Sequence, residues 1–228
     1  MVQFHQSYSY EDFIQGFRPI EGGGFYLKNG IFHDFCKKAA SDPENEYFFL
    51  IDEINRGNLG KIFGELMVLI EPDKRGTYAL PLAYSRSQEE TFTVPPNLYL
   101  IGTMNTADRS LALVDYALRR RFRIIDIEPA FGNPKFTNAL EYLGVPEMLV
   151  TRINDRLQRL NSIIAVETKT LGPGFRIGHS YFYPDHDGRP HDEKWYSDIV
   201  DYEIAPLLRE YWFDAPEKAQ EYIEVLKA

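Results

Sequence analysis

The chain has 228 residues, of which 44% are hydrophobic and 26% charged, as is typical of a globular protein with one large domain or two small ones. Its net charge of −9 creates no global field that would attract DNA or RNA, so any nucleic acid is expected to bind through another domain or subunit. We expect a cytoplasmic protein with no membrane partner. No apolar run approaches the ~20 residues of a membrane span, the N-terminus does not fit a signal peptide, and the single cysteine, Cys36, fits a reducing compartment.

The first forty residues predict the end of a strand, two helices and a turn. Val2 and Phe4 fit the end of a strand. A helix is expected to begin after Ser9 and to end at Pro19, which cannot continue it. A second helix is expected over residues 30–40, where apolar residues recur on one face.

Two stretches resemble a phosphate-binding loop, but neither forms one. A Walker A loop needs Gly, four residues, Gly-Lys and then Ser or Thr. The run Gly22–Gly24 is followed by Phe25 and is interpreted as a flexible turn. The pair Gly60-Lys61 is followed by Ile62, so it lacks the hydroxyl that binds magnesium. These 228 residues therefore contain no Walker A pattern.

The apolar run over residues 47–51 predicts a strand that is buried on both faces of a parallel sheet. It ends in Asp52 and Glu53, at the edge where open α/β sheets place their chemistry. A carboxylate at Asp52 suits magnesium coordination, direct or through a water, and Glu53 can orient and deprotonate a water that attacks a phosphate. We interpret the pair as a Walker B element. An exposed pair of acids without a catalytic role is the alternative.

An amphipathic helix is expected from Asn58 to Glu71, followed by a hairpin with arms near 78–84 and 90–94. A second buried strand is expected to begin at Leu98. Asn105 follows it, and in a parallel sheet with adjacent strands it would lie near the two acids. An amide at that point can hold the water or the γ-phosphate, so we predict a sensor role for Asn105.

A helix over residues 111–118 is expected to end in three arginines, Arg119, Arg120 and Arg121. Favourable placement against the helix dipole is one interpretation. However, three consecutive guanidinium groups point in different directions, so an arginine finger that reaches the phosphate of a neighbouring subunit is the other. A third apolar strand is expected over 122–127.

Helical patterns dominate after about Ala130, which predicts a two-domain organisation. The expected domains are an α/β core over residues 1–129 and a helical lid over 130–228. Arg176 and His179 lie in a segment that joins the lid helices. They could be presented toward the phosphates, and a structural role beside aromatic residues is an equal alternative.

Four motifs together resemble the McrB family of AAA+ GTPase motor subunits from modification-dependent, 5-methylcytosine-specific restriction systems. They are IDEINR, MNTADRS, VDYALRRRF and GFRIGHSYF. The resemblance spans about Phe4 to Tyr183. It implies a parallel αβα P-loop NTPase core followed by an all-helical lid, and it implies assembly into a ring, typically a hexamer. It also implies Mg²⁺ with GTP or ATP, and an endonuclease partner of the McrC type.

The resemblance also assigns expected roles to individual residues. By its motifs, Asp52 and Glu53 fall on the Walker B pair, Asn105 on the sensor position, and Arg120 and Arg121 where arginine fingers lie. The positions at subunit contacts are Arg56, Asp108, Arg109 and Asp115. From spacing alone, ion pairs between Asp115 and Arg56 or Arg109 are not distinguished from solvated surface pairs.

The departure from the family pattern is at the N-terminal side. Family members begin the motor with a strand, a Walker A loop and a helix, and this chain is expected to begin just after them, without the DNA-reading domain. We therefore expect a fragment or a truncated product that hydrolyses little nucleotide alone. The missing strand would lie between the sensor strand and residues 122–127, so a gap is expected there.

Two other functions remain open from the sequence. One is a nucleotide-independent oligomerisation or interaction module that keeps its ring-forming surfaces without catalysis. The other is an AAA+ ATPase of another pathway. The choice between GTP and ATP is likewise open, because the segments that set base selectivity are expected to lie outside these residues.

Overall fold

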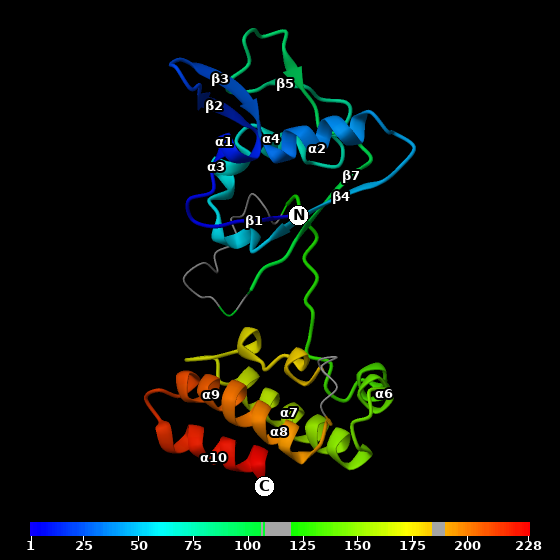
Figure 1. The fold of residues 1–228 in the computed structure, drawn as a ribbon, viewed down its shortest axis with the longest axis vertical. Coiled ribbons are helices and arrows are strands. Elements are labelled where there is room, and N and C mark those ends of the chain that lie inside the picture. The colour runs from blue at the N-terminus through cyan, green and yellow to red at the C-terminus, as the bar shows by residue number, and fades with distance from the viewer. Residues whose placement is uncertain (106, 108–119, 184–189) are drawn as a thin grey trace. The chain divides into compact units, whose positions relative to one another are not determined.

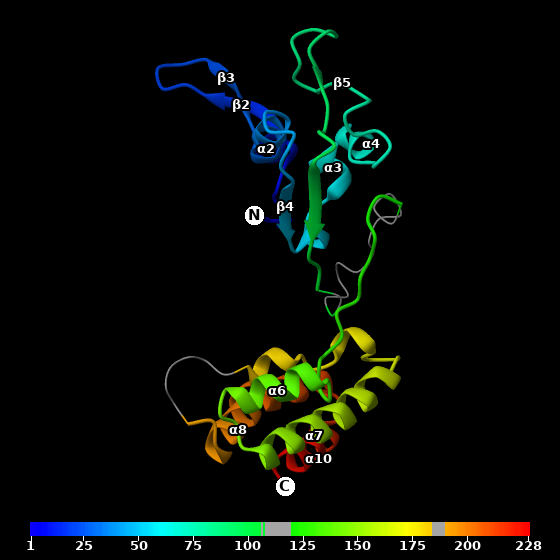
Figure 2. The same cartoon turned by 90° about the vertical axis from the view of Figure 1, so that its right-hand side faces the viewer.

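A computed structural model of the chain describes residues 1–105, 107, 120–183 and 190–228. They form two compact units, Met1–Ile125 and Asp126–Ala228. The first unit contains a parallel sheet with helices, and the second is helical (Figure 1, Figure 2). This architecture agrees with the predicted α/β core and helical lid.

The main sheet of the first unit has three parallel strands in the order β1-β4-β7. The strands are β1 (Val2–Gln3), β4 (Tyr47–Asp52) and β7 (Leu98–Gly102). Tyr47 is paired with Leu98 and Ile51 with Gly102, so β4 and β7 end at the same edge of the sheet. Within the described residues β7 has β4 as its one neighbour, which makes it an edge strand.

Aromatic side chains form the core between this sheet and the helices of the unit. The helices are α1 (Tyr10–Phe13), α2 (Ile31–Ala40), α3 (Leu59–Phe63) and α4 (Leu66–Leu69). Phe13 of α1 is fully buried, and its ring centroid lies 4.8 Å from that of Phe32 and 5.0 Å from that of Phe63. Phe49 and Ile51 of β4 are buried in the same cluster. This core fixes the position of β4.

The other face of the sheet is exposed, so the prediction of a strand buried on both faces was wrong. Phe48 and Leu50 of β4 are 50% and 39% exposed, and Tyr99 and Ile101 of β7 are 42% and 45% exposed. The register pairs Phe48 with Tyr99, whose rings stack with centroids 5.3 Å apart. An apolar run does not tell whether both faces of its strand are covered, and here one of them is not.

The predicted helix from Asn58 to Glu71 is broken in the middle. Gly64 has φ +51°, a left-handed conformation that ends α3 and lets α4 start in a new direction. The Tyr10 hydroxyl donates a hydrogen bond of 2.6 Å to the Glu65 carboxylate, which also accepts one from the backbone N–H of Ala83. Burial, and then the hydrogen bond to Glu65, raise the pKa of Tyr10. Glu65, directly after the break, therefore connects α1 to the segment after α4.

Two hairpins extend from the first unit. The predicted one has short strands, β5 (Leu80–Pro81) and β6 (Thr91–Phe92). The other, β2 (Gln15–Pro19) with β3 (Phe25–Asn29), replaces the later part of the helix expected after Ser9, which ends at Phe13. Gly22–Gly24 form its turn, all with positive φ, so the turn prediction is confirmed.

The predicted strand over 122–127 is not formed, because no described strand lies beside it to pair with. Ile125 and Ile127 are 78% and 88% exposed. The helix expected over 111–118 lies outside the described residues.

The second unit is built around one long helix. Its helices are α6 (Pro134–Tyr142), α7 (Glu147–Val166), α8 (Glu193–Ile199), the π-helix η5 (Val200–Ile204), α9 (Ala205–Tyr211) and α10 (Pro216–Lys227). Ile153 and Leu157 of α7 are fully buried in its core. The Glu167 carboxylate, just after α7, accepts hydrogen bonds from Lys218 at 2.7 Å and from the Trp212 indole at 3.1 Å, which joins α7 to the last helices.

Candidate active site

The carboxyl ends of β4 and β7 bring the predicted acids and Thr103 together. Thr103 follows β7 directly, as Asp52 ends β4. The Thr103 hydroxyl donates a hydrogen bond of 2.6 Å to Asp52 Oδ1, and its oxygen accepts one of 3.3 Å from the Glu53 backbone N–H. On the other side of β4, the Phe4 N–H donates to the Asp52 carbonyl at 2.9 Å. Asp52 is thus held from both neighbouring strands.

Glu53 has a backbone conformation that side chains rarely adopt. Its φ is 52° and its ψ 47°, and among the described residues it is the one non-glycine residue with positive φ. The turn leads into the 3-10 helix η1 (Ile54–Arg56). Such a residue persists when its surroundings hold it, and these residues cluster at active sites. Its carboxylate lies 3.3 Å from the Arg56 guanidinium and is 20% exposed.

Gly102 makes room for this turn. A Cβ at Gly102 would lie 2.8 Å from Ile54 Cδ1, closer than real side chains approach. Ile54 is 7% exposed and packs across the end of β7. A side chain at this position would therefore have to displace Ile54, and glycine avoids that displacement.

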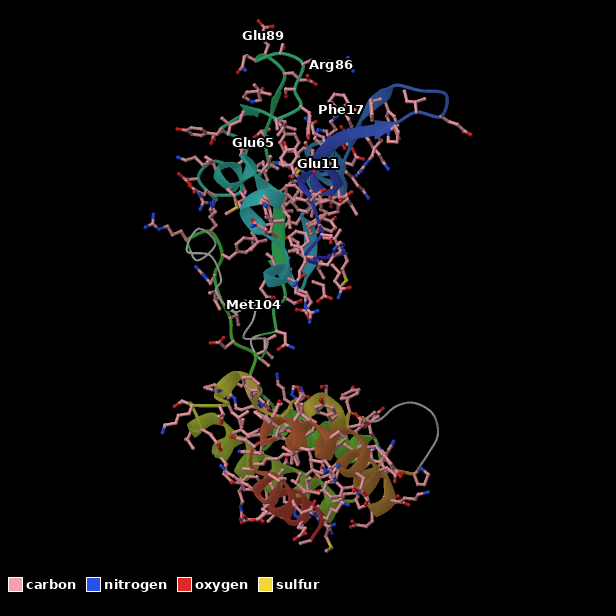
Figure 3. All side chains as sticks on the ribbon, turned by 90° about the vertical axis from the view of Figure 1, so that its left-hand side faces the viewer. Glu11, Phe17, Glu65, Arg86, Glu89 and Met104 are labelled. Carbon is pink, nitrogen blue, oxygen red and sulfur yellow. The ribbon has the colours of Figure 1, made fainter. Side chains whose placement is uncertain are left out.

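Asn105 lies two residues past Thr103 and contacts Asn55, which lies two residues past Glu53. The Asn55 side-chain amide is 3.4 Å from the Asn105 carbonyl oxygen. The Asn105 side-chain oxygen accepts a hydrogen bond from the Ala107 N–H at 3.0 Å, which leaves its NH₂ group as the donor end of the side chain. Figure 3 labels Met104 at this end of the first unit and Glu11, Phe17 and Glu65 toward the other end, so the hairpins lie away from the site.

The two described arginines of the predicted finger differ in environment. Arg121 forms an ion pair of 2.6 Å with Glu71, and its Nε donates to the Met67 carbonyl. Arg120 is exposed. Arg121 therefore ties this segment to the end of α4, whereas Arg120 faces solvent. Three other predicted positions, Asp108, Arg109 and Asp115, lie outside the described residues.

Arg176 and His179 contact the start of the second unit. Arg176 pairs with Glu128 at 3.2 Å. The His179 Nδ1 accepts a hydrogen bond from the Ala130 N–H at 3.1 Å, which requires an unprotonated Nδ1. The His179 ring also meets Phe136 edge-on. Within this unit both side chains hold the segment 128–130, in keeping with the structural alternative.

The oxygens at the strand ends fit a magnesium ion that carries nucleotide phosphates. Mg²⁺ prefers one or two carboxylates together with water and phosphate oxygens. Asp52 supplies one such carboxylate, with Oδ1 fixed by Thr103. Among the described residues, no group of three or more His, Cys, Asp or Glu side chains that could hold a metal ion is found.

Comparison with known families decides the relationship. Residues 1–122, just over half of the chain, match the AAA domain of the dynein-related subfamily. Residues 152–220 match the McrB alpha-helical lid domain. The chain belongs to the McrB family of AAA domains. The fold class predicted from the sequence, an AAA core with a parallel sheet and a helical lid, is thereby confirmed.

Two curated relatives are similar to this chain in sequence. The chain is 56% identical over 228 residues to the type IV methyl-directed restriction enzyme EcoKMcrB subunit of Escherichia coli (strain K12), a match that covers 99% of this chain and 50% of the relative. It is 28% identical over 189 residues to the type II restriction enzyme BsuMI component YdiS of Bacillus subtilis (strain 168), covering 74% of this chain and 53% of that protein. The chain spans about half the length of these relatives.

Thr103 is a residue of this candidate site that no sequence pattern indicated. A hydroxyl one position past the second buried strand is a weak signal by itself. It becomes informative with the register, because parallel pairing of Ile51 with Gly102 places Thr103 beside Asp52.

No helix in the described part of the chain has the length and apolarity that crossing a membrane requires.

Proposed function

We propose that this chain carries the water-activating half of a nucleoside-triphosphatase active site in a McrB-type motor of a DNA restriction complex. The observation that supports the proposal is the pair Asp52–Glu53, held at the carboxyl edge of the sheet by Thr103 with Asn105 beside it. Glu53 orients the attacking water and takes its proton. The NH₂ group of Asn105 donates to that water or to the γ-phosphate.

Asp52 is the residue proposed to hold Mg²⁺ with GTP or ATP, directly or through a water. The bound ion would neutralise charge on the phosphate oxygens. Asp52 is suited to this because Thr103 fixes one carboxylate oxygen and so orients the other. The phosphate cradle must come from residues other than these, since the sequence contains no Walker A pattern.

The remaining roles concern assembly. Arg120 or Arg121 reaches the nucleotide of the neighbouring subunit in a ring, which we propose is a hexamer. Arg120 is favoured for this role because Arg121 is paired with Glu71. Residues proposed at subunit contacts are Arg56, Asp108, Arg109 and Asp115. Arg176 and His179 sense the nucleotide from the lid, which requires Arg176 to release Glu128. We assign the core to residues 1–129 and the lid to 130–228.

The proposed partners follow from the family. They are an endonuclease subunit of the McrC type and DNA bound through another domain or subunit, because this chain has a net charge of −9. The proposed location is the cytoplasm. The two relatives are a subunit and a component of restriction enzymes, which supports a restriction complex as the setting.

The test compares Glu53→Gln with Glu44→Gln in the complete product of the gene that encodes this chain. Glu44 is an exposed acid of the same unit. Removal of the base is expected to lower turnover of GTP or ATP by about 10²–10⁴-fold with nucleotide binding retained, and Glu44→Gln should match the wild type. Loss of binding in Glu53→Gln would instead assign Glu53 a structural role.

The 228-residue chain alone is the second arm of this test. It should hydrolyse little GTP or ATP because it carries no Walker A loop. Robust hydrolysis by this polypeptide would contradict the proposed division of the site.

A second candidate function is a nucleotide-independent interaction module, favoured by the lack of a Walker A pattern in these residues. In that case assembly, measured by sedimentation, should be the same with and without nucleotide and Mg²⁺. Assembly that requires nucleotide would exclude it.

A further inference from the structure

The hydrogen bonds at the end of the β4–β7 ladder are displaced by one residue. The Thr103 N–H donates to the Ile51 carbonyl at 2.9 Å, as in a regular parallel pair. Regular continuation would bring the Glu53 N–H to the Thr103 carbonyl. Instead the Ile54 N–H donates to that carbonyl, at 2.9 Å. Glu53 is therefore an extra residue in the ladder, equivalent to a bulge.

The left-handed backbone of Glu53 accounts for this displacement. One known class of bulge has a residue with positive φ at its first position. Bulges beside active sites redirect a side chain. The displacement takes the Glu53 N–H out of the ladder. In place of the Thr103 carbonyl, this N–H donates to the Thr103 hydroxyl oxygen at 3.3 Å.

Few side chains could serve both contacts at position 103. A hydroxyl has one proton to donate and two lone pairs to accept with. The proton of Thr103 goes to Asp52 Oδ1 at 2.6 Å, and an oxygen lone pair accepts from the Glu53 N–H. Valine has the same shape but can make neither bond, while serine can make both.

We propose that Thr103 is a positioning residue that sets both acids for hydrolysis, by orienting the carboxylate of Asp52 and by stabilising the one-residue displacement that directs Glu53. This inference rests on the proposed function for its consequence in turnover. The bridge that the Thr103 hydroxyl forms, through its hydrogen bonds to Asp52 and to the Glu53 N–H, can be tested without it. Thr103 acts through the two acids and does not itself touch the substrate.

The first experiment measures backbone amide hydrogen exchange in the 228-residue chain. In Thr103→Val the Glu53 amide should exchange roughly tenfold faster, as expected for loss of one hydrogen bond, while amides of α2 keep their protection. Thr103→Ser should retain the slow exchange. Equal protection of the Glu53 amide in wild type and Thr103→Val would overturn the proposal. If Thr103→Val does not fold, fast exchange of this amide in a folded Thr103→Ser would overturn it.

The second experiment measures GTP and ATP turnover by the complete gene product. Thr103→Val should lower kcat by about 10–100-fold, as for a small misplacement of catalytic groups, with little change in KM, and Thr103→Ser should restore most of the activity. An unchanged kcat in Thr103→Val would overturn the positioning role. If the wild type shows no turnover, the proposed function fails, and the exchange experiment still decides whether Thr103 forms the bridge.

Discussion

The strained backbone of Glu53 makes a quantitative prediction about stability. Its φ of 52° is left-handed, which costs a non-glycine residue about 1–2 kcal/mol. Glycine adopts this conformation freely but loses about 0.5–1 kcal/mol through its greater freedom in the unfolded chain. Glu53→Gly should therefore be more stable than Glu53→Ala by about 0.5–1 kcal/mol. The comparison with alanine is the matched one, because both variants lose the Arg56 ion pair.

Urea unfolding of the 228-residue chain measures this difference. With a typical slope of about 1–3 kcal/mol per molar urea, the midpoint of the first unit should differ by roughly 0.2–1 M between the two variants. Circular dichroism follows both units. The two tryptophans, Trp195 and Trp212, lie in the second unit, so their fluorescence is an internal control that should not change. A glycine variant no more stable than the alanine variant would refute the assignment of strain to Glu53.

Three further predictions concern stability in each unit. Arg121→Ala should destabilise the first unit by about 1–2 kcal/mol, because it removes charged hydrogen bonds that are largely shielded from water. Arg120→Ala should change the stability of this unit by less than about 0.5 kcal/mol. Equal effects of the two substitutions in urea unfolding would contradict the difference in environment. Lys218 lowers the pKa of Glu167 below its usual 4.5. The contribution of Glu167 is therefore present above pH 4.5 and lost as pH falls through its lower folded pKa, and Glu167→Gln should flatten that acid limb in tryptophan fluorescence. Phe13→Ala should cost the first unit about 3–5 kcal/mol, measured by circular dichroism, and a loss below ~1 kcal/mol would show that the aromatic core repacks around the site.

Local patterns were sufficient to predict the main elements. The apolar runs predicted β4 and β7, and helical periodicity predicted α2 nearly to its ends. The hairpin β2–β3 was missed because Phe13, Ile14 and Phe17 also fit a helix face. In the structure Phe17 instead meets the ring of Tyr84, 67 residues (84 − 17) later in the chain, and a contact of that range is not visible in local spacing.

The candidate site was predictable in its residue types and in which strands carry them. Asp52 ends β4 and Asn105 lies three residues past β7, and parallel pairing brings the ends of these two strands to one edge of the sheet. The displacement at Glu53 was not predictable, because it depends on which carbonyl of β7 each N–H of β4 reaches. The role of Thr103 depends on the same register, so it too required the structure.

The exposed face of the sheet has a consequence for how the chain behaves in solution. An apolar patch lies on β4 and on the edge strand β7, formed by Phe48, Leu50, Tyr99 and Ile101. An apolar patch on an edge strand favours pairing between copies of the chain. A net charge of −9 opposes that pairing by mutual repulsion. Added salt weakens the repulsion, since the screening length falls from about 10 Å at 0.1 M to about 3 Å at 1 M. Colloidal stability should thus decrease as ionic strength rises, and light scattering at fixed protein concentration would follow it.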